Sequence, residues 1–171
     1  MSRDDREKIF AESGGERPVE RPVETVEKPP AAPIVVVVES FGGIKDGSKL
    51  ANMHVAVTLV DADGEPLEPA TTTPMGAATA KQDGRVVFDA PVTTRATHGS
   101  LPPGAAMLFE LRHFKAEEKK MSVKCWAFAP AEDIAPGARG EYPTLTKPTD
   151  PTRKKTRRFN KGAPDVRVRF A

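Results

Sequence analysis

Residues 105–128 contain the clearest alternation of apolar and polar side chains in this sequence. The stretch reads AAMLFELRHFKAEEKKMSVKCWAF, and its two alternating runs, 107–112 and 123–128, flank the charged segment 115–120. Alternation with a period of two on both sides of a polar segment predicts an antiparallel β-hairpin. Large apolar residues occupy both faces of this hairpin, so we expect it at the centre of a two-layer fold and not at an exposed sheet edge.

Other segments repeat the strand pattern along the chain. They are residues 34–41, 53–60, 85–88, 142–146 and 166–170. The first is a β-branched run, IVVVVESF, which suits a central strand and ends at a glycine pair. With the hairpin, the sequence predicts about seven or eight strands, the number expected of an all-β antiparallel sandwich.

The first 33 residues have a different composition. After the initiator Met they contain five large aliphatic or aromatic side chains, too few to bury a core. The motif Glu-Arg-Pro-Val occurs twice, and its regular prolines favour an extended path. This tail is either a disordered linker or a peptide that lies along a partner and is anchored by Val19, Val23 and Val26. We therefore expect a tail at 1–33 and a β-sandwich domain at 34–171.

The chain has no segment suited to a membrane or to secretion. Its longest apolar run, Ile34 to Val38, is far shorter than the roughly 20 residues that a membrane span needs. The charged N-terminus lacks the apolar stretch of a signal peptide. Cys125 is the single cysteine, which excludes an intrachain disulfide. Its place in a strand pattern predicts a buried structural thiol in a reducing, cytoplasmic setting.

Charge is unevenly distributed along the chain, although the net charge is only +2. Residues 1–33 carry 6 basic and 8 acidic groups, and residues 34–146 carry 11 and 14. Residues 147–171 carry 9 basic and 2 acidic groups, a net charge of +7. This concentration of positive charge at one end predicts an anionic partner, such as lipid headgroups, an acidic protein surface or nucleic acid.

Five motifs give the sequence a family resemblance. They are GIKDG (43–47), LVDADGEPLEP (59–69), GAAMLFELRHFK (104–115), SVKCWAFAPAEDIAPG (122–137) and KPTDPTRKK (147–155). With these motifs, the region from Ile34 to Phe170 resembles the Aida-type C2 domain family. The resemblance implies an eight-stranded C2-type β-sandwich whose loops at one end bind lipids or proteins. We expect the Pro-rich tail in the place of that family's N-terminal helical domain.

The resemblance also bears on calcium, because many related domains collect aspartates around this ion in their loops. Where the family's first loop carries Asp-Pro-Tyr, this chain has Asn52-Met53-His54, which leaves Asp46 without its usual partner. The hairpin loop 115–120 contains three lysines at positions where calcium-binding relatives place aspartates. Lysines repel a divalent cation, so we predict that the domain holds no metal and acts independently of calcium.

The basic run near the C-terminus supplies most of the candidate binding residues. With two lysines from the hairpin, they are Lys115, Lys124, Arg153, Lys154, Lys155, Arg157, Arg158 and Lys161. Near an anionic membrane each such residue contributes about 1 kcal/mol, and an acidic protein such as a microtubule wall offers a similar attraction. A solvated loop without a dedicated ligand is the third interpretation. Nucleic acid is disfavoured, because Phe159 is the one aromatic residue among these cations and base stacking needs more.

Nothing in the sequence indicates catalysis or a cofactor. His54, His98 and His113 fall on a strand, a loop and a strand, without the spacing of a metal site or a catalytic base. Our first hypothesis is a non-catalytic scaffold module docked in a larger intracellular assembly, such as the cytoskeleton or a cilium, with its tail along a protein partner. The second is calcium-independent binding to phosphoinositides or other anionic phospholipids at a membrane surface.

Overall fold

The computed structural model describes residues 31–44, 50–74, 80–82, 85–152, 157–162 and 164–171. The tail residues Val19, Val23 and Val26 lie outside these ranges, as does Asp46. The tail and its boundary at residue 33 therefore remain predictions. None of the described segments forms a helix that is long and apolar enough to cross a membrane.

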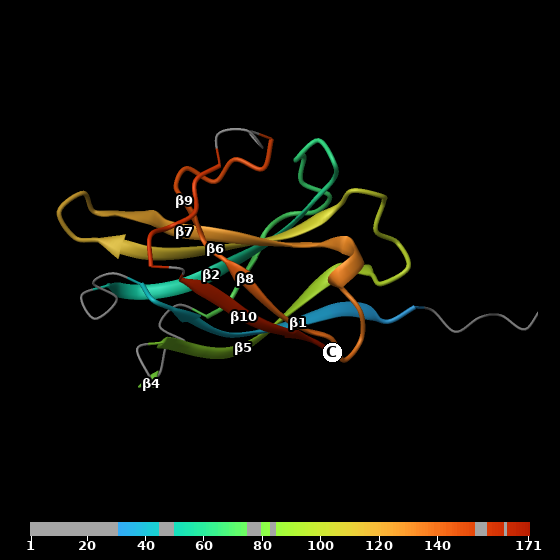
Figure 1. Cartoon of the computed structure of the whole chain (residues 1–171), viewed down its shortest axis with the longest axis horizontal. Coiled ribbons are helices and arrows are strands. Elements are labelled where there is room, and N and C mark those ends of the chain that lie inside the picture. Colours follow the sequence, from blue (N-terminus) through green and yellow to red (C-terminus); the bar gives the residue numbers. More distant parts are fainter. Residues whose placement is uncertain (1–30, 45–49, 75–79, 83–84, 153–156, 163) are drawn as a thin grey trace, which may run out of the picture. The chain divides into compact units, whose positions relative to one another are not determined.

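Two antiparallel sheets form the domain, as the sequence predicts (Figure 1). Sheet A has the strand order β4-β5-β1-β10-β8, and sheet B has the order β3-β2-β6-β7-β9. The strands are β1 Pro33–Gly42, β2 Ala51–Val60, β3 Thr71–Thr72, β4 Ala80–Gln82, β5 Arg85–Thr97, β6 Ala106–Lys115, β7 Lys120–Pro130, β8 Arg139–Pro143, β9 Leu145–Thr146 and β10 Asp165–Phe170. Among the described residues, eight strands have three or more residues, as expected of the sandwich, and β3 and β9 are two-residue additions.

The core lies between the two sheets. Strand alternation turns Val36 and Val38 of β1 inward from sheet A, where they join Phe109 and Leu111 of β6 from sheet B in one buried cluster. All four side chains are fully buried. Burial of a side chain of this size contributes about 1.5–3 kcal/mol, so this layer of apolar side chains supplies most of the attraction between the sheets.

The predicted hairpin is β6 and β7, and both strands lie inside sheet B between β2 and β9. This position confirms the expectation that the hairpin is not a sheet edge. On its second apolar face, Leu108 and Trp126 of the hairpin join Val60 of β2 and Leu145 of β9 in a smaller buried cluster. Arg157, from the segment between β9 and β10, covers this cluster, with its guanidinium carbon 5.7 Å from the Trp126 ring centroid and 4.7 Å from that of Phe128.

Two of the predicted strands differ most from their bounds in the structure. The segment 85–88 extends to Thr97, because small polar residues continue the alternation, and Thr94 is buried and donates a hydrogen bond to the Ile34 carbonyl at 3.1 Å. The predicted strand 142–146 divides at Thr144 into β8 of sheet A and β9 of sheet B. The chain thus crosses from one sheet to the other at this residue.

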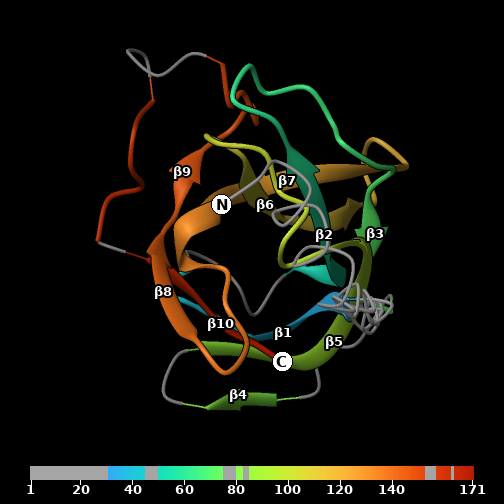
Figure 2. The same ribbon diagram turned by 90° about the vertical axis from the view of Figure 1, so that its right-hand side faces the viewer.

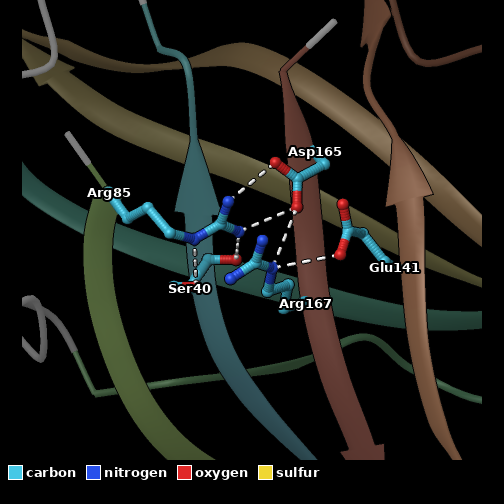
Figure 3. Close-up of polar contacts among 5 residues, drawn as sticks. All are labelled: Ser40, Arg85, Glu141, Asp165 and Arg167. Carbon is cyan, nitrogen blue, oxygen red and sulfur yellow. Dashed lines mark hydrogen bonds and ion pairs between the residues drawn. The ribbon is translucent and has the colours of Figure 1, made fainter. Parts of the chain in front are cut away.

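A polar network ties four strands of sheet A together at one end of the sheet (Figure 3). Arg85 of β5 forms a bidentate pair with Asp165 of β10, at 2.7 and 2.9 Å, and donates to the Ser40 hydroxyl of β1 at 2.7 Å. Arg167 lies 3.5 Å from Asp165 and 3.1 Å from Glu141 of β8. Bidentate arginine–carboxylate geometry fixes the pairing specifically, so this network holds the register of the sheet where β1 ends and β10 begins.

Candidate functional site

A groove of about 490 Å³ lies where the connector between β9 and β10 (residues 147–164) passes β7, β9 and the end of β1. We call it the basic groove. Its lining combines the cations Lys124, Arg158 and Lys161 with the apolar side chains of Ile44, Phe159 and Pro164. Three of the candidate residues named from the sequence are therefore neighbours around one cavity.

A β-bulge brings Lys124 to the basic groove. In the β6–β7 ladder Leu111 pairs with Cys125 and Arg112 pairs with Val123, so Lys124 has no residue opposite it. A bulge bends its strand and redirects the side chain of the extra residue. Lys124 and Cys125, which a regular strand would direct to opposite faces, consequently both line the groove.

Hydrogen bonds to the sheet-switching segment fix the connector wall of the groove. The Thr146 N–H donates to the Arg158 carbonyl at 2.8 Å, and the Asn160 N–H donates to the Thr144 carbonyl at 3.0 Å. The Asn160 side-chain amide donates to the Thr144 hydroxyl at 2.9 Å and to the Leu145 carbonyl at 3.2 Å. These bonds join the connector to β9, so the backbone of residues 158–160 is held in place while the side chains of Arg158 and Phe159 stay exposed.

The described lining of the groove is positively charged and contains no acidic counter-ion. None of the described lining residues is acidic, and within the same part of the chain Lys124, Arg158 and Lys161 form no ion pair. Unpaired cations around a partly apolar cavity attract an anionic ligand and give up little existing interaction when it binds. The arrangement suits binding of an anionic, partly apolar surface.

Cys125 forms part of the inner wall of the groove but is only 2% exposed. Burial raises the pKa of its thiol to about 12, although a hydrogen bond to Thr144 acts in the opposite direction. The thiolate is the nucleophilic form of cysteine, and this environment suppresses it at neutral pH. The position fits the structural role that the sequence predicts for this residue.

Comparison with known proteins identifies the family. The family model described as "Axin interactor dorsalisation-associated protein, C-terminal" (Aida C2) matches residues 22–170. This chain belongs to the Aida C2 family. The β-sandwich of the structure is the fold that the resemblance implied.

The curated relatives of this Aida C2 chain are considerably longer than it is. Axin interactor, dorsalization-associated protein of Danio rerio is 35% identical over 113 residues, which cover 66% of this chain and 36% of the relative. The Xenopus laevis protein A is 34% identical and the Homo sapiens protein 33% identical, each over 119 residues that cover 70% of this chain and 38% of the relative. The matched region thus spans less than two fifths of each of these three relatives.

Of the remaining candidate residues of the Aida C2 chain, Lys115 and Arg157 lie away from the groove. Lys115 lies at the β6–β7 turn, where its ammonium is 2.9 Å from Glu118. Hydrogen bonds from Lys120 and then Lys115 lower the pKa of the Glu118 carboxyl to about 2. Arg157 covers Trp126 and Phe128, and one of its terminal nitrogens donates to the Pro151 carbonyl at 2.6 Å. Arg153, Lys154 and Lys155 lie outside the described residues.

The sequence indicated the cations of the groove but not its apolar part. Phe159 is 63% exposed, and Ile44 and Pro164 come from segments that sequence patterns gave no reason to join. The available signal was the sequence RRFNK at 157–161, in which one large apolar side chain stands among cations without a strand or helix period to bury it. No group of three or more potential metal ligands lies together in the described ranges.

Proposed function

We propose that this chain is a non-catalytic protein-interaction module, a C2-type domain docked in a larger intracellular assembly. The basic groove carries the proposal, because three cations that form no ion pair with another described residue surround a cavity beside the exposed side chain of Phe159. Aromatic and arginine side chains supply much of the binding energy in protein interfaces. An acidic protein surface with an apolar side chain matches this combination.

The names of the relatives support a protein partner. They are called axin interactors, and we infer that this Aida C2 chain also binds a protein, with axin as the first partner to test. The tail is proposed to lie along the partner through Val19, Val23 and Val26. A cytoplasmic assembly is the proposed setting, and the cytoskeleton and the ciliary axoneme are the structures in which to look first.

Affinity purification of the tagged chain, followed by gel filtration and mass spectrometry, tests this function. Replacing Lys124, Arg158 and Lys161 with Glu should remove a stoichiometric partner from the complex. Replacing Lys115, Lys119 and Lys120 with Glu makes the same change in charge at the hairpin turn and should leave the partner bound. Deletion of residues 1–30 should weaken the complex. An identical partner yield from both triple variants would contradict the role of the groove.

Calcium-independent binding of anionic phospholipid is the second candidate. It is favoured by the same unpaired cations, together with the net charge of +7 over residues 147–171. Sedimentation with phosphoinositide vesicles at about 0.1 M salt, with and without calcium, measures this activity while surface attraction is still incompletely screened. Vesicle binding should survive deletion of residues 1–30 and fail when Arg153, Lys154 and Lys155 become Glu. Salt-sensitive sedimentation without any stable protein complex would select the lipid function.

A further inference from the structure

Residues 158–160 form a short outer edge on sheet B. Phe159 pairs with Leu145 of β9 in an antiparallel bridge, and the two hydrogen bonds beside the bridge use the Arg158 carbonyl and the Asn160 N–H. In this type of pair the N–H and C=O of the central residue point away from the neighbouring strand. Within the described residues, the N–H and C=O of Phe159 have no hydrogen-bond partner.

The surroundings of this edge are open to a partner. Figure 2 shows the described part of the connector, in red, along the outer border of the domain, outside β8 and β9. The Phe159 ring is 63% exposed, and Arg158 and Lys161 are exposed on either side of it. Lys124 lines the same groove. A donor and acceptor pair that points away from β9, an exposed aromatic residue and three cations therefore lie within one small surface.

We propose that residues 158–160 accept an extended acidic segment of a partner protein as an added strand of sheet B. This inference rests on the proposed protein-docking function and names the chemistry of the partner. The backbone of the segment bonds the N–H and C=O of Phe159, while its acidic side chains pair with Arg158, Lys161 and Lys124. An apolar side chain of the segment covers the Phe159 ring. Strand addition of this kind combines affinity from main-chain hydrogen bonds with specificity from side chains.

The free backbone groups favour a peptide over a membrane. Lipid phosphates satisfy cations, but they cannot pair with an N–H and a C=O at the spacing of one strand residue. A peptide strand offers that alternation of donors and acceptors along its whole length. The edge is also short and flanked by cations, a combination that disfavours pairing with a second copy of the same positive edge.

The test uses the full chain and a fluorescent eight-residue peptide of alternating glutamate and valine. Phe159→Ala and Phe159→Pro both remove the ring, but only proline also removes the outward N–H. No hydrogen bond among the described residues uses that N–H, so both variants should keep the wild-type circular dichroism spectrum and unfolding temperature. We expect Phe159→Pro to bind the peptide about fivefold more weakly than Phe159→Ala, the effect of one net hydrogen bond. Replacing Arg158 and Lys161 with Glu should weaken binding at least about tenfold, and less in high salt.

Several outcomes would overturn the inference. Equal affinities of Phe159→Ala and Phe159→Pro would exclude strand addition, and equal binding of a lysine–valine peptide would exclude acidic recognition. If the glutamate–valine peptide does not bind at about 1 mM, its dissociation constant is weaker than about 1 mM, and this result would exclude the site. If phosphoinositide vesicles then bound through Arg158 and Lys161, the groove would be a lipid site. A groove-dependent protein complex recovered without peptide binding would leave the docking function standing and reject only this mode of recognition.

Discussion

Arg157 and Arg158 are adjacent in sequence but have different environments. Arg157 lies over the rings of Trp126 and Phe128 and is half-buried, whereas Arg158 is exposed at the basic groove. A guanidinium over an aromatic face gains cation–π attraction, and its aliphatic stem covers apolar surface. One arginine thus holds the connector on the outer face of sheet B, and the other is available to a ligand.

Substitution of these two arginines should separate stability from binding. We expect Arg157→Ala to lower the free energy of unfolding by about 1–2 kcal/mol, through lost cation–π contact and packing. Arg158→Ala, its matched control, should stay within about 0.5 kcal/mol of wild type. Urea unfolding followed by fluorescence of Trp126, the single tryptophan, measures both. Equal stabilities of the two variants would mean that the Arg157 contact contributes nothing.

His54 and His113 predict a loss of stability in acid. Burial is the main cause that lowers the pKa of each imidazole, with positive charge from Arg112 near His54 and from Lys124 near His113 also contributing. As the pH falls through 6.5, the usual pKa of histidine, the unfolded chain binds protons before the folded chain does. The free energy of unfolding should therefore fall from pH 7.5 to pH 5.5.

Urea titrations at these two pH values measure the effect. The variant carrying both His54→Gln and His113→Gln should lose less stability between pH 7.5 and pH 5.5 than wild type, because it lacks the two groups that resist protonation. Comparing each protein with itself at the two pH values removes the direct cost of the substitutions. A steeper fall in the variant than in wild type would contradict the explanation.

The Arg85–Asp165 pair connects strands β1, β5 and β10, and we predict that it contributes to the stability of the domain. The two side chains are only 14% and 16% exposed, so removal of one leaves a nearly buried charge without its partner. We expect Asp165→Ala to cost about 2–3 kcal/mol, with the partial exposure reducing the larger penalty of a fully buried pair. Glu141→Ala removes a 60% exposed carboxylate of the same network and should change stability by about 0.5 kcal/mol or less. Thermal unfolding of both variants measures these losses of stability. Equal losses in the two variants would contradict the role of the Arg85–Asp165 pair.

Gly42 lies beside the Arg85–Asp165 pair, where a larger residue would not fit. A Cβ atom at this position would collide with the Arg85 guanidinium and lie 2.9 Å from Asp165. Its neighbour Gly43 has a φ of +66°, in the region that favours glycine. The glycine pair that marked the end of the first strand in the sequence is therefore required both by the ion pair and by the turn.

Strand elements were predictable where apolar and polar residues alternate strictly. The β6–β7 hairpin follows from that pattern, because alternation determines which side chains face a core. The C-terminal half of β5 was missed, since small polar residues such as Thr94 contribute little apolar signal although the strand still pairs with β1 at Thr93 and Thr97. The division of 142–146 at Thr144 was also missed, because the sequence does not record which sheet each strand joins.

The site was less predictable than the strands. The sequence identified the cations but could not separate Arg157, which packs on rings, from Arg158, which faces the groove. It also placed Lys124 on the opposite strand face from Cys125, because a bulge is a change of register that periodicity does not encode. The place of Phe159 at the groove could not be predicted, because it depends on how the connector packs beside β9.

For the whole molecule, we predict that calcium does not change the stability of the domain. The loop 115–120 contains three lysines, two of which pair with Glu118. Since a ligand that binds only the folded state raises its stability, calcium binding would raise the unfolding temperature. We expect equal unfolding temperatures in about 1 mM calcium, the weak end of protein calcium affinities, and in excess chelator. A reproducible rise in calcium would show a site that the sequence does not suggest.

The buried thiol at the inner wall of the groove gives the domain a natural kinetic reporter. Cys125 is the single cysteine of the chain and is 2% exposed, so an alkylating reagent reaches it only when the structure around β7 opens locally. Its modification rate under native conditions therefore measures how often this side of the sandwich opens, by the logic of hydrogen exchange. A bound partner should slow that rate without touching the sulfur, so occupancy of the groove can be followed in the unmodified sequence.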